Sequence, residues 1–175
     1  STVAQGLLWS GAHSGHPAIV RLALSCVDWP RDDARWHEML RRVLGGHPEP
    51  DRERYYECFR LTLERCHPGV RGGTYRTTLL HDLSGSWPHR PCGPEERVTL
   101  ATMLLDAGAP LNVRDSVLTS TPLGWACRWG RIEMVRLLLS RAADADEADA
   151  EPWATPRAWA RKGNHPEIQE LLDQG

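Results

Sequence analysis

The chain has 175 residues, of which 41% are hydrophobic, enough for the packed core of an ordinary domain. Its formal net charge of −2 at pH 7 differs from the strongly basic balance of nucleic-acid-binding proteins, so we expect no nucleic-acid partner. No apolar run approaches the length of about 18 residues that a membrane span needs, and the first residues lack the basic start followed by an apolar stretch that is typical of a secretory leader. We therefore expect no contact with a membrane.

The cysteines show no C-x-x-C spacing, and their number, five, is odd. They are Cys26, Cys58, Cys66, Cys92 and Cys127. Most of them fall on apolar faces of expected helices, where cysteine behaves as a small hydrophobic residue. This pattern predicts a reducing, cytoplasmic setting. The chain begins at Ser1 without a methionine, which indicates a processed or trimmed product.

The first predicted unit spans about residues 2–29. Residues 15–25, GHPAIVRLALS, match residues 130–140 in six of 11 positions. We expect a helix before Gly15 and a second helix after it.

The second unit, about residues 30–69, is the least regular. Apolar residues recur at helical spacing from Trp36 to Leu44, and the segment GGHPEP (45–50) then interrupts the pattern. Asp51 is the expected cap of a second helix that carries Tyr55 and Phe59. We interpret this unit as a degenerate repeat with a long internal loop.

The third unit, about residues 70–109, opens at Thr78-Leu79-Leu80-His81. The Gly-, Ser- and Pro-rich segment 84–93 is expected to be an insertion on the rim. A helix should follow, with Pro94 at its first position and Gly108 in a left-handed conformation after its end.

The fourth and fifth units, about residues 110–144 and 145–175, carry the clearest repeat. Moving residues 121–138 by 34 positions places them on residues 155–172, with seven of 18 positions identical. In the fourth unit Thr121 can cap a helix, Pro122 fits its first turn, and Gly130 should end it. Trp125 and Trp159 occupy the same repeat position, and we expect both in the core.

A period near 33 residues, with Thr-Pro opening one helix and Leu-Leu closing the next, resembles the ankyrin repeat. The resemblance implies a single domain over residues 1–175, an all-α solenoid of about five helix–turn–helix units with short hairpin fingers. It also implies a buried Thr–His hydrogen bond, for which only Thr78 and His81 are present together, because Gly124 and Ala158 stand in the histidine place of later units.

Catalytic and metal-binding patterns are absent from the sequence. His13 and His16 have no ligand set around them, and no Gly-rich phosphate loop or nucleophile motif occurs. We expect no enzyme activity, no catalytic residue, no metal, no cofactor and no small-molecule substrate. An enzyme that uses the loop bearing His89 and Cys92 is the rival hypothesis.

The resemblance also indicates which residues form the binding face. Solenoids bind partners on the concave face formed by finger tips and first helices. Carried over by position, that face includes Tyr75, Arg76, Val117, Leu118, Ser120, Arg128, Trp129, Glu151, Ala154 and Lys162, with Trp153 as a further candidate. We expect Trp129 to point away from the stack, where it would serve binding and contribute nothing to folding.

The best functional hypothesis is a non-enzymatic scaffold that holds a protein or peptide partner in its concave groove. The alternative is that the protein is a stoichiometric inhibitor or immunity-type partner of an enzyme and uses the same surface to block it. The five carboxylates between Asp144 and Glu151 are interpreted as a solvated, self-repelling loop, with a docking patch for a basic partner as the second interpretation.

Overall fold

The computed structural model describes residues 2–44, 52–85 and 93–174 of the chain. These residues form ten helices. Their bounds are α1 Thr2–Ser14, α2 Pro17–Ser25, α3 Arg35–Leu44, α4 Arg52–Leu63, α5 Leu79–Ser84, α6 Pro94–Asp106, α7 Pro122–Arg128, α8 Ile132–Ser140, α9 Pro156–Lys162 and α10 Pro166–Asp173.

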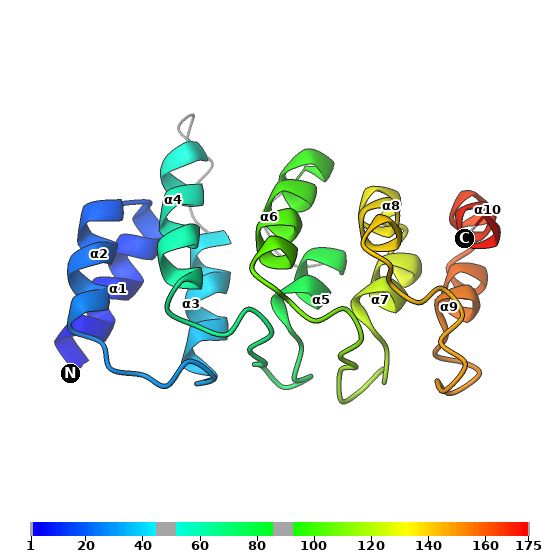
Figure 1. Ribbon diagram of the computed structural model, residues 1–175, viewed down its shortest axis with the longest axis horizontal. Helices are drawn as coiled ribbons and strands as arrows, with labels where there is room; N and C mark the ends of the chain where they lie inside the picture. Colours follow the sequence, from blue (N-terminus) through cyan, green and yellow to red (C-terminus); the bar gives the residue numbers. More distant parts are fainter. Residues whose placement is uncertain (1, 45–51, 86–92, 175) are drawn as a thin grey trace.

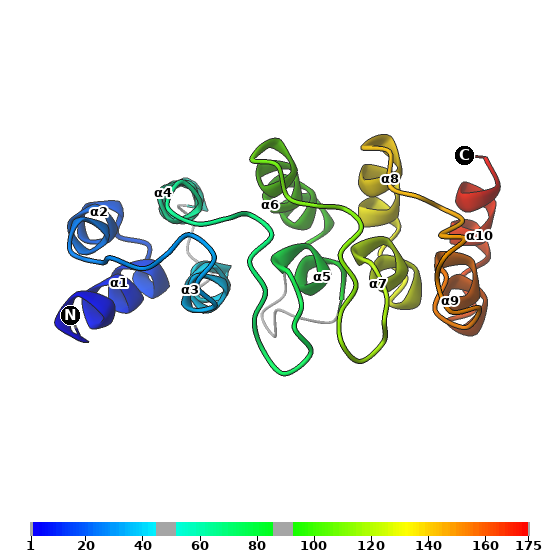
Figure 2. The same ribbon diagram turned by 60° about the horizontal axis from the view of Figure 1, so that its bottom comes forward.

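Consecutive helices pair, and the five pairs stand side by side along the long axis, with the chain ends at opposite ends of the molecule (Figure 1). The odd-numbered helices form one row and the even-numbered helices a second row (Figure 2). Each odd-numbered helix packs against the next one, from α1 through to α9. Short helices bury enough apolar surface only by stacking in this way. The predicted all-α solenoid is confirmed.

Local sequence signals start the helices where they were expected. The Thr121 hydroxyl accepts the N–H of Gly124 at 3.2 Å, and the Thr155 hydroxyl accepts that of Ala158 at 3.1 Å. A proline occupies the first turn of each of these helices, where it removes no helical hydrogen bond. The repeat therefore places two equivalent caps one period apart.

Two glycines end helices as predicted. Gly108 has φ +92° and Gly130 has φ +66°, backbone conformations that residues other than glycine rarely adopt. At Gly130 a Cβ would also lie 2.6 Å from the ring of His165 in the next unit. Gly130 thus both turns the chain and allows the fifth unit to pack closely.

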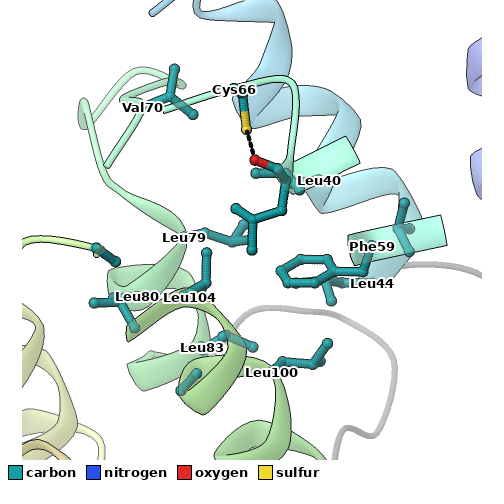
Figure 3. Close-up of a cluster of buried hydrophobic side chains, with 14 of the residues drawn as sticks. Leu40, Leu44, Phe59, Cys66, Val70, Leu79, Leu80, Leu83, Leu100 and Leu104 are labelled. Atoms are coloured by element: carbon teal, nitrogen blue, oxygen red, sulfur yellow. Dashed lines mark hydrogen bonds between the residues drawn. The ribbon is translucent and has the colours of Figure 1, made fainter. Parts of the chain in front are cut away.

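The core runs continuously between the pairs. Figure 3 shows the part of it where α3 and α4 meet α5 and α6, with Phe59 of α4 among leucines of α3, α5 and α6. Trp125 is 7% exposed and Trp159 is 2% exposed, so the prediction that both are core residues is confirmed.

The least regular segments include residues outside the described part. Segment 45–50, Asp51 and most of segment 84–93 lie there; α5 ends at Ser84, and α6 begins at Pro94. Among the residues that are described, none of the helices combines the length and the apolar character needed to cross a membrane.

Candidate functional site

The third finger is a tight hairpin between α4 and α5. Gly72 and Thr77 form an antiparallel bridge, and the tip between them carries Tyr75, whose side chain is exposed. A Cβ on Gly72 would lie 2.4 Å from the ring of His37, so this position needs a glycine. The finger is thereby pressed against α3 of the preceding unit.

Asp115 organises the fourth finger. Its carboxylate accepts the backbone N–H groups of Val117, Leu118 and Ser120 at 2.9, 2.7 and 3.1 Å. It also accepts the indole N–H of Trp125 at 2.9 Å. Burial by itself would raise the pKa of Asp115, but these donors outweigh it and lower the pKa below its ordinary value. The charged carboxylate therefore fixes the tip that carries Val117 and Leu118.

Hydrogen bonds join adjacent fingers. Ser116 donates its backbone N–H to the carbonyl of Tyr75 at 2.8 Å, and Arg71 donates to the carbonyl of Arg114 at 2.6 Å. The Arg114 guanidinium in turn contacts both carboxylate oxygens of Asp149 in the fifth finger, at 3.0 and 3.2 Å. The three fingers are thus held at fixed positions along one face.

Two neighbouring depressions lie on the face formed by the fingers and the first helices. The first has a volume of about 550 Å³. It is lined by Arg41, Gly73, Thr74, Tyr75, Thr77, Asp82, Val117, Leu118, Trp125, Arg128 and Trp129. The second has a volume of about 280 Å³ and is lined by Arg128, Trp129, Trp159, Lys162 and Gly163. Because Arg128 and Trp129 line both, we treat the two depressions as one groove.

Asp82 provides the one carboxylate among the described residues that line the groove. Its Oδ1 accepts the hydroxyl of Thr77 at 3.0 Å. Its Oδ2 lies 3.0 Å from Nε2 of His37 and 3.5 Å from Nε of Arg41, ion-pair distances without the alignment of hydrogen bonds. The negative charge of Asp82 is therefore engaged within the protein.

Aromatic rings position the cations at the C-terminal end of the groove. The Arg128 guanidinium lies 4.4 Å from the centroid of Trp159 and 5.0 Å from that of Trp129. The Lys162 ammonium lies 5.2 Å from the Trp159 centroid. Such contacts hold a cation over a ring face and leave its outward N–H groups available.

The structure brings six of the expected site residues into the groove. Tyr75, Val117, Leu118, Arg128, Trp129 and Lys162 all line it. Arg76, Glu151 and Trp153 are exposed on the fingers but line neither depression.

Ser120 and Ala154 were expected on the binding face, and that expectation is wrong. Both are fully buried, at 0% exposure. The Ser120 hydroxyl instead accepts the indole N–H of Trp159 at 2.7 Å. These positions join the fingers to the first helices, so they support the face without reaching its surface.

Trp129 also differs from its prediction. Its ring is half-buried and lies 4.9 Å from the ring of Trp125, centroid to centroid, with an interplanar angle of 35°. The expectation that it gains nothing from folding is therefore wrong. It turns back along α7 because Trp125, one helical turn earlier, offers an apolar surface on the same side.

Sequence reasoning missed Arg41, Thr77 and Asp82 as groove residues. They come from α3, the third finger and α5, and their proximity depends on how the second and third units stack. The one available signal was Asp82 itself, a charged residue among the leucines of the short segment that forms α5.

One carboxylate of the acidic fifth finger is less solvated than expected. Glu147 is only 3% exposed, and burial raises the pKa of its carboxyl. Asp149 pairs with Arg114, and Asp146 pairs with Arg157 at 3.2 Å. The interpretation as a solvated loop is therefore wrong for Glu147. It holds for Asp146 and Asp149, whose side chains are 76% and 82% exposed although an arginine of the chain pairs with each.

The predicted Thr–His hydrogen bond is confirmed. The Thr78 backbone N–H donates to Nδ1 of His81 at 3.1 Å, and the Thr78 hydroxyl lies 2.9 Å from the same atom. The opposite nitrogen, Nε2, lies 3.0 Å from the carbonyl of Ser120. Burial lowers the pKa of His81 to about 4, so the ring is neutral and Nε2 carries its proton.

Three of the described cysteines have raised pKa values. Burial raises the pKa of Cys58 to about 11, and that of Cys66 and Cys127 to about 12, which keeps these thiols protonated at neutral pH. Within the described ranges there is no group of three His, Cys, Asp or Glu side chains placed to hold a metal ion. His89 and Cys92, the residues of the rival hypothesis, lie outside those ranges.

Comparison with known proteins agrees with the architecture. Residues 120–150 match the family described as the ankyrin repeat. The matched segment contains the end of the fourth finger, α7, α8 and the start of the fifth finger. No curated protein matches the chain. The matched repeat, its one-period copy in the fifth unit and the stacked helix pairs together show an ankyrin-repeat solenoid.

Proposed function

We propose that this protein is a non-enzymatic scaffold that binds a segment of another protein in the groove defined above. Ankyrin repeats are protein–protein interaction modules, and the groove lies on the face that such solenoids use. The observation that carries the proposal is the first depression, which places Tyr75, Val117, Leu118 and Trp129 around one space of about 550 Å³.

The chemistry of this depression suits an apolar side chain of a partner. Tyr75 is 52% exposed and Val117 is 50% exposed, although both are large apolar residues at the tips of fingers that hydrogen bonds hold in place. Exposed apolar surface of this kind commonly marks a binding site. Rigid presentation also lowers the conformational entropy lost on binding.

The test is selection of peptides from a random library displayed on phage, with the full chain immobilised. Selected peptides are then synthesised, and their affinity is measured for the wild type and for the double variant Tyr75→Ser/Val117→Ser. Leu22→Ser is the matched control, because Leu22 is 62% exposed on α2, away from the groove.

We expect the double variant to weaken binding at least tenfold and the control to leave it unchanged. Circular dichroism melts check that all variants are folded. Selected peptides that bind the double variant with wild-type affinity would contradict the proposal, because their site would lie elsewhere on the molecule.

A further inference from the structure

We infer that the partner segment is acidic: beside the apolar side chain that enters the first depression, it places carboxylate groups in the second depression, between Arg128 and Lys162. This inference rests on the proposed function and specifies the chemistry of the partner. The two depressions share Arg128 and Trp129, so an extended segment that fills the first passes directly into the second.

Charge distribution is the first argument. Arg128 and Lys162 are two cations on the rim of one depression of about 280 Å³, and neither has a carboxylate within ion-pair distance among the described residues. Elsewhere in the C-terminal half, four arginines pair with acids of the same chain: Arg114 with Asp149, Arg136 with Glu167, Arg141 with Asp106, and Arg157 with Asp146 and Asp173. The groove therefore places side by side two cations that no carboxylate of the described residues neutralises.

The second argument is geometric. Both cations lie over the ring of Trp159, which is itself fixed by the hydrogen bond from its indole N–H to Ser120. A guanidinium stacked on a ring presents its planar N–H edge outward, the arrangement that binds a carboxylate through two parallel hydrogen bonds. Arg128 is half-buried, so little side-chain entropy remains to be lost when a ligand binds.

The remaining charges favour a protein segment over a nucleic acid. The acidic fifth finger borders the same face, and its exposed carboxylates would repel a continuous polyanion. A short peptide with a few acidic side chains can place them at Arg128 and Lys162 alone. The apolar lining of the first depression also has no match in a sugar–phosphate backbone.

The experiment uses fluorescein-labelled 12-residue peptides with a central Leu or Phe and three flanking residues that are all Glu, all Gln or all Lys. Affinities for the full chain are measured by fluorescence anisotropy at low and moderate salt. The variants are Lys162→Ala, Arg128→Ala and the matched control Arg161→Ala, which removes an exposed cation of the same helix as Lys162 that lines neither depression. Lys162 is exposed, so its variant remains informative even if Arg128→Ala is poorly folded.

We expect the Glu peptides to bind at least tenfold more tightly than the Gln peptides, and to lose most of that preference at moderate salt. Lys162→Ala and Arg128→Ala should each reduce the preference at least threefold, whereas Arg161→Ala should keep it.

The possible failures are separable. Equal binding of Glu and Gln peptides, still weakened by Tyr75→Ser/Val117→Ser, would overturn the acidic preference and leave the proposed groove intact. A preference reduced equally by Arg161→Ala would overturn the site assigned to Arg128 and Lys162. Displacement of the Glu peptide by a single-stranded oligonucleotide at similar concentration would overturn the choice of a protein segment. Absence of binding by every peptide would overturn both proposals.

Discussion

Trp125 donates its indole N–H to Oδ1 of Asp115 over 2.9 Å, and this bond joins the floor of the groove to the finger above it. Trp159, one period later, donates instead to the Ser120 hydroxyl, at the other end of the same finger. Two tryptophans at one repeat position therefore hold the fourth finger from adjacent helices, α7 and α9. The first of these bonds lies within the fourth unit, and the second crosses from the fifth unit to the fourth.

Asp115→Ala is expected to lower the free energy of unfolding by about 2–4 kcal/mol, because three backbone N–H groups and one indole lose their acceptor in a buried setting. Trp125→Phe keeps an aromatic ring and removes only the N–H, so it should cost about 1–2 kcal/mol. Urea denaturation of both single variants and the double variant measures the coupling. Strictly additive losses would show that the bond between Trp125 and Asp115 contributes nothing.

Trp125→Ala and Trp159→Ala should each destabilise the protein by about 3–5 kcal/mol, the usual cost of deleting a buried aromatic side chain. The two variants should differ in how many units lose structure, because units of a solenoid contact only their neighbours. Trp125→Ala is expected to loosen the third to fifth units, and Trp159→Ala mainly the last one. Hydrogen exchange read by mass spectrometry tests this, and uniform protection loss in both variants would contradict it.

Trp129→Ala is expected to cost about 1 kcal/mol of stability, because the ring loses its contact with Trp125 and its position over Arg128. In the same variant, the peptides selected for the groove should bind with an affinity weakened by about 2 kcal/mol or more. Thermal melts and isothermal titration measure the two effects. A stable variant with full affinity would place the partner outside the two depressions.

Acidification should destabilise the protein through His81. The pKa of His81 is lowered to about 4 by burial, whereas the pKa of a histidine in an unfolded chain is near 6.5. Between these values the unfolded state binds more protons than the folded state, so stability falls as pH decreases from about 6.5 to about 4. The upper limit of this loss is about 3 kcal/mol.

Histidine NMR signals followed against pH provide the direct measurement. The ring signals of His81 should keep their neutral positions down to about pH 5, because protonation of Nδ1 would oppose the N–H of Thr78. A midpoint near 6.5 for His81 would contradict the buried, neutral ring.

Much of the fold follows from local signals in the sequence. Thr121 with Pro122, and Thr155 with Pro156, define helix starts through hydroxyl caps and a fixed proline φ, which involve only a few consecutive residues. Gly130 ends its helix for an equally local reason. The 34-residue offset between the fourth and fifth units then predicts stacking, because two short amphipathic helices need a neighbour to cover them.

The groove depends on contacts between residues far apart in the chain. Repeat position identified Tyr75, Val117 and Arg128 as surface candidates, but gave no distance between one unit and the next. Arg41 and Asp82 come into the groove because α3 stacks against α5, and the contact of Asp82 with Nε2 of His37 forms at the same junction.

The sequence by itself determined the repeat, the helix ends and the core tryptophans, because caps, turns and periodicity act within one unit. Only the tertiary structure decided which polar residues reach solvent. Ser120 and Glu147 are polar residues in finger segments, yet the stack buries both, while Arg128 and Lys162 meet over Trp159. Burial and charge pairing depend on the distance between units, and that distance is set by the packing of whole helices against one another.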